Sequence, residues 1–181
     1  MKTEIATFAG GCFWCLDSAF RRVKGVDLVE SGYCGGHSES PNYETVCNGG
    51  TGHAEAVRLE FDASLVDYRT LLSFFFSLHD PTTLNRQGAD IGTQYRSAIF
   101  YHNQQQFEEA KEIIEDLEHR GVWANPIVTE LVPAGRFYPA EHYHQDYFAN
   151  NKSNRYCQMV ISPKLIKFIN RYKDLLKGED Y

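Results

Sequence analysis

The feature that most restricts the fold of this chain is a change of hydrophobic period at the glycine pair Gly10 and Gly11. Before the pair, residues 3–8 carry β-branched and aromatic side chains in loose alternation, a pattern typical of a strand. After it, apolar residues recur at helical spacing, at Phe13, Leu16, Phe20 and Val23. We therefore expect a strand, a tight turn and a helix, with Cys12 in the first turn of that helix.

The rest of the chain continues to mix strand and helix periods around two long polar loops, 34–52 and 82–93. Further strands are expected at 26–33, 53–61, 95–101 and 127–132, and further helices at 68–78, between the cap Asn103 and Gly121, at 141–149 and after Pro163. This order predicts an α+β fold, a two-layer sandwich resembling a split βαβ (ferredoxin-like) plait with extra helices and long loops. Loops of this length in compact domains tend to be functional.

Length and charge limit the organisation and the partners of the protein. No linker or internal repeat interrupts the chain, so residues 1–181 are expected to form a single catalytic domain, with 150–181 as a partly mobile C-terminal segment. The net charge of -6 and the lack of a basic stripe argue against a nucleic-acid partner. No apolar run approaches the ~20 residues of a membrane helix, and residues 1–4 lack a signal-peptide core, so we expect a soluble, cytoplasmic protein.

Cys12 is the first candidate for chemistry. At the start of a helix, unpaired backbone N–H groups and the helix dipole favour negative charge, which lowers the pKa of a thiol and makes it a nucleophile. Cys15 lies one turn further on the same face, so the two form a Cys-x-x-Cys arrangement. Phe13 and Trp14 place large aromatic groups beside the reactive sulfur. The pattern indicates redox chemistry, although two cysteines that merely pack in the core would give the same sequence pattern.

A zinc site is the other structural explanation of the Cys-x-x-Cys pair. Such a site needs a second close pair of ligands. Cys34 and Cys47 are too widely separated to provide one, and His142 and His144 flank a single residue, which is not a usual ligand spacing. The odd number of five cysteines also argues against a structural disulfide framework. Zinc is therefore not expected.

Glu55 is the second candidate, because it lies on the apolar side of its strand together with Val57 and Leu59. A carboxyl group on that side is costly unless it is paired or protonated, so its pKa should be raised, as in a general acid. A solvated position at the strand end would be the alternative. Tyr43 and Tyr95 lie in or beside the long loops, where phenols could donate hydrogen bonds to a substrate oxygen or simply pack.

Taken together, the chain resembles the peptide methionine-S-sulfoxide reductase family, A type. The resemblance covers most of the chain through several specific strings in the same order. These strings are Gly11–Trp14, Ser31–Gly36, Tyr43–Cys47, Thr51–Val57, His79–Thr83, Arg86–Asp90, Gly92–Ile99, Phe137–Glu141 and His144–Tyr147.

The resemblance implies that Cys12 attacks the sulfoxide sulfur while Glu55 donates a proton to the sulfoxide oxygen. The pocket residues that it implies are Phe13 and Trp14 as the wall for the S-methyl group, Tyr43 and Tyr95 as hydrogen-bond donors to the oxygen, and Asp90 and Tyr147 as lining. Methionine leaves, Cys12 becomes a sulfenic acid, and a second thiol condenses with it into a disulfide that thioredoxin reopens. The family needs no metal or organic cofactor.

The second thiol is where this chain departs from many members of the family, which have glycine at the place of Cys15 and use cysteines near the C-terminus. Cys157 falls close to one such position and is preferred, with Cys15 as the next candidate. Cys34 and Cys47 are expected to be buried structural thiols. A general thiol-disulfide oxidoreductase using Cys12 and Cys15 is the competing function, and Glu55 distinguishes the two because disulfide exchange needs no acid for a substrate oxygen.

Overall fold

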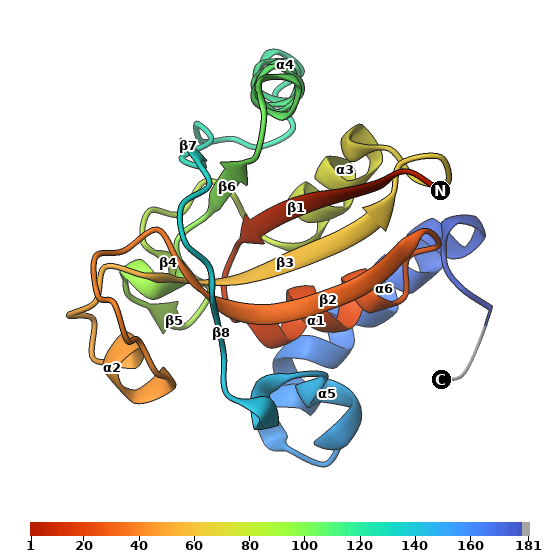
Figure 1. Ribbon diagram of the computed structural model, residues 1–181. Helices are drawn as coiled ribbons and strands as arrows, with labels where there is room; N and C mark the ends of the chain where they lie inside the picture. The colour runs from red at the N-terminus through yellow and green to blue at the C-terminus, as the bar shows by residue number, and fades with distance from the viewer. Residues whose placement is uncertain (179–181) are drawn as a thin grey trace.

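One mixed sheet organises the computed structural model, which describes residues 1–178 (Figure 1). Within these residues the sheet has six strands in the order β7-β6-β1-β3-β2-β8, and a separate hairpin consists of β4 and β5. The strands are β1 (Thr3–Ala9), β2 (Val26–Cys34), β3 (Ala54–Asp62), β4 (Arg86–Gln87), β5 (Asp90–Ile91), β6 (Ala98–Tyr101), β7 (Glu130–Pro133) and β8 (Tyr138–Pro139). Neighbouring strands are antiparallel except β6 and β7, which are parallel.

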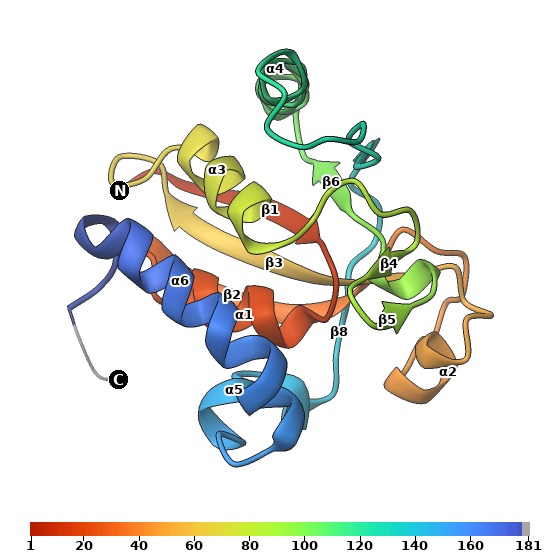
Figure 2. The same ribbon diagram turned by 180° about the vertical axis from the view of Figure 1, so that it is seen from behind.

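Three of the helices, α1, α3 and α6, cover one face of the sheet (Figure 2). The helices are α1 (Phe13–Arg21), α2 (Tyr43–Cys47), α3 (Tyr68–Leu78), α4 (Gln104–His119), α5 (Tyr147–Asn150) and α6 (Ser162–Tyr172). Short 3-10 turns occur at Thr93–Tyr95, His142–His144 and Lys173–Leu175, and a π-helical turn at Cys157–Ile161 leads into α6. The described residues contain no helix long and apolar enough to cross a membrane.

The main core lies between the sheet and these helices, and aromatic rings dominate it. Phe8 of β1 stacks on Phe20 of α1 at 5.6 Å and on Phe75 of α3 at 5.0 Å between ring centroids. Phe168 of α6 meets Phe74 of α3 edge to face at 5.3 Å. The residues of β3 alternate, so that Val57 and Leu59 join this core while Ala54 and Ala56 join a smaller cluster on the other face. Glu55 consequently faces the helices.

The mixed α+β class and the change of period at Gly10 and Gly11 are confirmed. Gly11 has a φ of 79°, a left-handed conformation that favours glycine, and α1 begins directly after Cys12. The cap of α4 also lies where it was expected, because the Asn103 side chain accepts a hydrogen bond from the backbone N–H of Gln106. Gly121, with a φ of 62°, follows the end of this helix.

Five expected elements differ in the structure, the first being the strand expected at 95–101, which is β6 and begins at Ala98 after the 3-10 turn at Thr93–Tyr95. The loop 34–52 contains the short helix α2, whose five residues are too few to show a period. The loop 82–93 contains the hairpin of β4 and β5. The strand expected at 127–132 is β7, which begins at Glu130. The helix expected at 141–149 is divided, because Asp146 adopts a left-handed φ of 52° between the 3-10 turn and α5.

The C-terminal segment 150–178 packs against the rest of the molecule. Phe168 and Leu176 are almost completely buried, and Leu176 forms an isolated β-bridge with Val23 after the first helix. The remaining residues of the expected mobile segment, 179–181, lie outside the described residues. Figure 1 shows α6 beneath the sheet, alongside α1.

The loop that carries α2 is closed at its base by a close approach of two backbone segments. Gly36 and His37 lie against Thr51 and His53, and the His37 N–H donates to the carbonyl oxygen of Thr51 at 3.0 Å. A Cβ atom at Gly36 would lie 2.3 Å from the backbone nitrogen of His53 and 2.4 Å from the Thr51 oxygen. The loop base therefore requires glycine at position 36.

We predict that Gly36→Ala separates the two backbones and lowers the free energy of unfolding by roughly 1–3 kcal/mol, as overpacked sites do. Amide hydrogen exchange of residues 37–52 should accelerate. Gly50→Ala is the matched control in the same loop, because a Cβ atom there would meet no atom within 4 Å. Equal exchange and stability in the two variants would contradict this account of the loop base.

Candidate active site

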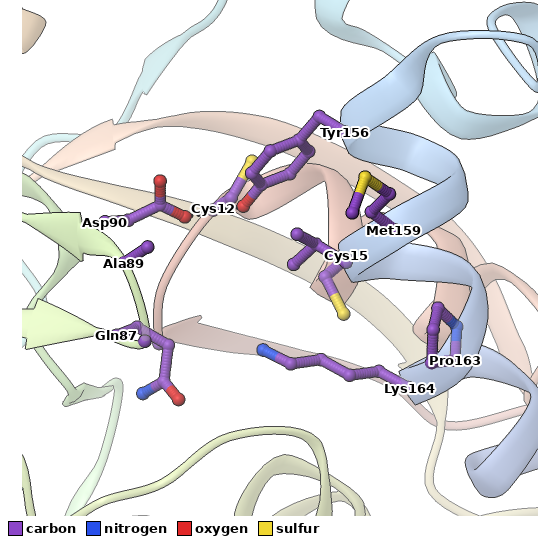
Figure 3. Close-up of a pocket in the computed structure, with 12 residues that line it drawn as sticks. Cys12, Cys15, Gln87, Ala89, Asp90, Tyr156, Met159, Pro163 and Lys164 are labelled. Atoms are coloured by element: carbon purple, nitrogen blue, oxygen red, sulfur yellow. Dashed lines mark hydrogen bonds between the residues drawn. The ribbon is translucent and has the colours of Figure 1, made fainter.

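Cys12 lies at the junction between the end of β1 and the start of α1. It is the N-cap residue of the helix, with extended backbone angles of φ -63° and ψ 127°. The turn before Cys12 is held against the 3-10 turn at Thr93–Tyr95, because the Gly11 N–H donates to the Tyr95 carbonyl oxygen at 3.2 Å. The Cys12 side chain is half-buried, and Figure 3 shows its sulfur between Asp90 and Tyr156.

Glu55 lies beneath the first turn of α1. Its side chain is only 1% exposed, and its Oε1 accepts the backbone N–H of Phe13 at 3.2 Å. Burial raises the pKa of Glu55 to about 8, and the nearby Asp90 carboxylate adds to the rise, while the Phe13 N–H opposes it. The expected burial and raised pKa of this carboxyl group are thus both present. Near neutral pH, Glu55 retains a proton.

The expectation of a lowered pKa for Cys12 is wrong for this structure. Burial raises the pKa of Cys12 well above its ordinary value, and the negative charge of Glu55 raises it further, while the backbone N–H of Trp14 lowers it. Sequence reasoning considered only the helix N-terminus, which lowers the pKa of a thiol. Desolvation and a neighbouring carboxyl group raise the pKa of Cys12 by more than the helix N-terminus lowers it. Since the Glu55 contribution depends on its charge, protonation of Glu55 makes ionisation of Cys12 easier.

Trp14 forms an aromatic wall beside Cys12. Its ring stacks on Tyr147 of α5 with 3.7 Å between centroids and 8° between planes, and Tyr43 lies 6.4 Å away. The Trp14 indole N–H donates to Nδ1 of the fully buried His144 at 3.0 Å. Phe13 is fully buried and packs against Tyr33, so Trp14 is the more accessible of the two expected wall residues.

Two phenols and a thiol gather on the side of the site away from α6. The hydroxyls of Tyr43 and Tyr95 both act to lower the pKa of the Cys47 thiol, although burial raises it overall. Burial raises the pKa of each tyrosine, and the charge of Glu55 contributes to both rises, which places this group within electrostatic range of Glu55. Cys47 is half-buried, so the expectation that it is a buried structural thiol is wrong. The structure brings Tyr43 and Tyr95 together as potential hydrogen-bond donors.

A cavity of ≈ 360 Å³ opens on the other side of Cys12, between the β4–β5 hairpin and α6 (Figure 3). Asp90 of the hairpin lines it and accepts a hydrogen bond from the Tyr156 hydroxyl at 2.5 Å. Figure 3 also shows the ring of Tyr156 beside the Cys12 sulfur, and the two groups affect each other's ionisation. Sequence reasoning missed Tyr156, because a single tyrosine in the C-terminal segment carries no sign that the segment folds back onto Cys12.

The remaining expected thiols differ in their access to this cavity. All five cysteines are free. Cys15 is 6% exposed and lines the cavity, and its sulfur points down toward the side where Lys164 lies (Figure 3). Cys157 is fully buried in the core and directly follows Tyr156 at the start of the π-helical turn. Cys34 is buried, as expected, with a pKa that burial raises to about 12.

The sequence analysis also missed a partly buried polar network behind the Trp14 wall. Glu141 accepts hydrogen bonds from the Tyr33 hydroxyl at 3.0 Å and from the backbone N–H of Tyr43 at 3.1 Å. The histidine that accepts from Trp14, His144, lies 4.0 Å from the same carboxylate. The pair His142 and His144 had been considered only as metal ligands. Among residues 1–178, no three side chains of the His, Cys, Asp and Glu types gather in a way that could hold a metal ion.

Comparisons with known proteins place these features in a family. The sequence profile described as "Peptide methionine sulfoxide reductase" matches residues 4–176. The peptide methionine sulfoxide reductase MsrA of Chromobacterium violaceum is 55% identical over 175 residues, which is 97% of this chain and 99% of the relative. The MsrA of Saccharolobus solfataricus is 52% identical, over 96% of this chain and 97% of the relative.

Solved structures agree with the sequence comparison. Reduced Mxr1 of Saccharomyces cerevisiae superposes with a TM-score of 0.79 at 36% identity, over 86% of this chain and 90% of that one. Methionine sulfoxide reductase A of Corynebacterium diphtheriae gives the same TM-score and identity, over 84% and 76%. Mxr1 in complex with Trx2 gives a TM-score of 0.56 at 26% identity, over 81% and 85%. The chain therefore belongs to the peptide methionine sulfoxide reductase family.

Proposed function

We propose that this chain reduces methionine-S-sulfoxide, free or in proteins, to methionine, with Cys12 as nucleophile. The observation that carries the proposal is the pair formed by a half-buried Cys12 and a protonated Glu55, joined through the first N–H of α1. A sulfoxide oxygen leaves only when it is protonated, so its reduction by a thiol needs an acid at the site of attack. Family membership supports the same reaction.

In the proposed first step, the sulfur of Cys12 attacks the sulfoxide sulfur while Glu55 gives its proton to the sulfoxide oxygen. The Tyr43 and Tyr95 hydroxyls hydrogen-bond this oxygen, and the ring of Trp14 receives the S-methyl group. The proton that Cys12 loses returns to Glu55. The substrate S–O bond and the transient bond between the two sulfurs then break as the oxygen binds the sulfur of Cys12, so methionine leaves and Cys12 becomes a sulfenic acid, with no proton gained or lost overall.

In the proposed second step, another thiol condenses with the sulfenic acid, forms a disulfide and releases water. We propose Cys157 for this role. Tyr156, its neighbour in sequence, already reaches Cys12, and the π-helical turn that begins at Cys157 is a rare conformation concentrated at functional sites. Because Cys157 is fully buried, the turn has to open for the two sulfurs to meet.

Cys15 is the second candidate, because it lines the same cavity as Cys12 and follows it by one helical turn. A disulfide between an N-cap cysteine and a cysteine three residues later needs a change of side-chain rotamer and no unfolding. In either case the disulfide has to be reopened by an external dithiol. We propose thioredoxin, in keeping with the likeness to Mxr1 solved in complex with Trx2.

A general thiol-disulfide oxidoreductase is the competing function. The Cys12 and Cys15 pair alone would serve it equally well. Disulfide exchange does not need an acid that delivers a proton to a substrate oxygen, because its leaving group is a thiolate, whereas Glu55 is a buried carboxyl group with a pKa of about 8. This arrangement favours the sulfoxide reductase.

We also propose a more detailed fold type, a domain organisation and a cellular location for the protein. The strand order β6-β1-β3-β2, with β3 between β1 and β2 and with α1 and α3 as the connections, supports a two-layer split βαβ plait. Residues 1–181 then act as a single catalytic domain whose segment from residue 150 moves during recycling. The cytoplasm is the proposed location, since its thiol buffers keep five free cysteines reduced.

Substrate stereochemistry provides the first test. Purified protein with dithiothreitol should consume the S epimer of N-acetyl-methionine sulfoxide and leave the R epimer, as chiral chromatography would report. Cys12→Ser should lose this activity entirely, because a hydroxyl is too weak a nucleophile without an activating base. Consumption of the R epimer alone, or activity in Cys12→Ser, would disprove the proposal.

The acid role of Glu55 gives a second prediction. Glu55→Gln should slow the single-turnover reduction by roughly 100-fold or more, as removal of a general acid does. In the wild type the rate should fall as the pH rises above about 8, where Glu55 loses its proton, and this decline should be absent in the variant. Glu60→Gln, on the opposite face of β3, is the control and should behave like the wild type. Equal rates in the two variants would remove Glu55 from the mechanism.

The recycling thiol gives a third prediction. Cys157→Ser should release one equivalent of methionine per protein and then stop with thioredoxin as reductant, because the sulfenic acid on Cys12 persists. Dimedone labelling followed by peptide mass mapping would detect that sulfenic acid. Cys15→Ser is the matched variant and should continue to turn over. If the results are exchanged between the two variants, the role belongs to Cys15.

A further inference from the structure

Lys164 places an unpaired positive charge in the cavity beside the reactive thiol. It belongs to the first turn of α6, and Figure 3 shows its side chain extended across the cavity below Cys15. It is the only cationic residue among those that line the cavity. Its side chain is half-buried, yet within residues 1–178 it forms no hydrogen bond or ion pair. An anionic ligand in the cavity would therefore find a positive charge that has no ion-pair partner among the described residues.

The groups around Lys164 do not neutralise it. Burial raises the pKa of Cys15, so this thiol is uncharged near neutral pH even though Lys164 acts to lower that pKa. Burial lowers the pKa of His79 to about 4, which leaves its ring neutral as well. The amide of Gln87 is occupied by the backbone N–H and carbonyl oxygen of Asp80. The charge of Lys164 is therefore available to a ligand.

The cavity also contains one carboxylate, and its position divides the cavity into two ends. Asp90 lies beside Cys12 and is held by the Tyr156 hydroxyl at 2.5 Å, whereas Lys164 lies beside Cys15 (Figure 3). Between them the lining is largely apolar, with Met159, Val160 and Pro163 from the C-terminal segment. The end near Cys12 adjoins the proposed sulfoxide site, and the end near Lys164 suits an anion.

The spacing matches the neighbourhood of one methionine sulfoxide residue. Cys15 follows Cys12 by three residues, which is roughly 5 Å along the helix axis. Adjacent residues of a bound peptide are separated by about 3.8 Å between Cα atoms. A carboxylate on the residue next to the reacting side chain, or at the end of the same amino acid, is thus displaced from the sulfoxide by a distance comparable to the separation of Cys12 and Cys15, and Lys164 lines the cavity at its Cys15 end.

We propose that Lys164 makes this part of the cavity a carboxylate-binding subsite, which selects methionine sulfoxide that has a carboxylate nearby. The carboxylate comes from an acidic neighbour in a peptide or from the α-carboxylate of a C-terminal or free methionine sulfoxide. The inference rests on the proposed reductase activity and adds a preference among its substrates. Complementary charge in a binding cavity acts mainly on selection between ligands.

The test compares blocked peptides in which glutamate, glutamine or lysine follows the methionine-S-sulfoxide, with dithiothreitol as reductant. The wild type should show a kcat/KM for the glutamate peptide above that for the lysine peptide, and added salt should reduce the ratio. Lys164→Glu should lower this ratio by roughly five- to tenfold, because it exchanges attraction for repulsion. Lys164→Met should bring the ratio close to one, and it serves as the second variant if the charge reversal disturbs folding.

Lys167→Glu is the matched control, since it makes the same change of charge on an exposed position of the same helix. It should keep the wild-type ratio. A second pair of substrates, N-acetyl-methionine-S-sulfoxide and its amide, separates the α-carboxylate from an acidic side chain as the source of the selected charge. A preference for the acid over the amide that disappears in Lys164→Met would assign the α-carboxylate.

Three results would overturn the subsite, namely a wild-type ratio of one or less, an unchanged ratio in Lys164→Glu, or an equal shift in Lys167→Glu. The last result would attribute the preference to the overall field of the protein and not to this cavity. Failure of the reductase proposal itself would look different, because then even the neutral glutamine peptide would not be reduced.

Discussion

The hydrogen bond from the Phe13 backbone N–H to Glu55 is the interaction on which the rest of the site depends. It joins the central strand β3 to the first turn of α1, so one contact fixes both the acid and the helix that carries Cys12. The N–H groups at the start of a helix have no partner within the helix and bind anions well. Here one of these N–H groups, that of Phe13, donates a hydrogen bond to the buried Glu55 carboxyl group, so the start of the helix holds the acid in place.

Burial then acts on both members of this pair in ways that suit sulfoxide chemistry. It raises the pKa of Glu55 to about 8 and raises the pKa of Cys12 as well. At neutral pH Glu55 and Cys12 are therefore both protonated and uncharged, which a low-dielectric position favours. The protonated acid is ready for the substrate oxygen, and the thiol is protected from unspecific oxidation until a substrate is bound.

The C-terminal segment completes the site from a distance in sequence. Tyr156 reaches both Asp90 and Cys12, and Lys164 enters the neighbouring cavity, so the segment that carries Cys157 also forms one side of the pocket. Opening the π-helical turn to bring Cys157 to Cys12 would dismantle that side of the pocket. In this scheme, disulfide formation and product release would be coupled by the movement of one segment.

The sequence by itself determined the elements with a strong period and the residues whose chemistry is local. The change from strand to helix at Gly10 and Gly11, the position of Cys12 at the start of the helix, and the side of the strand on which Glu55 lies all follow from spacing along a few residues. The tertiary structure alone decided the pKa of Cys12, because desolvation and the charge of Glu55 come from a strand more than forty residues away. It also decided the approach of Tyr156 and Lys164, since contacts between distant segments leave no period in either segment. Local backbone geometry is encoded locally, whereas burial and charge at a site are properties of everything that packs around it.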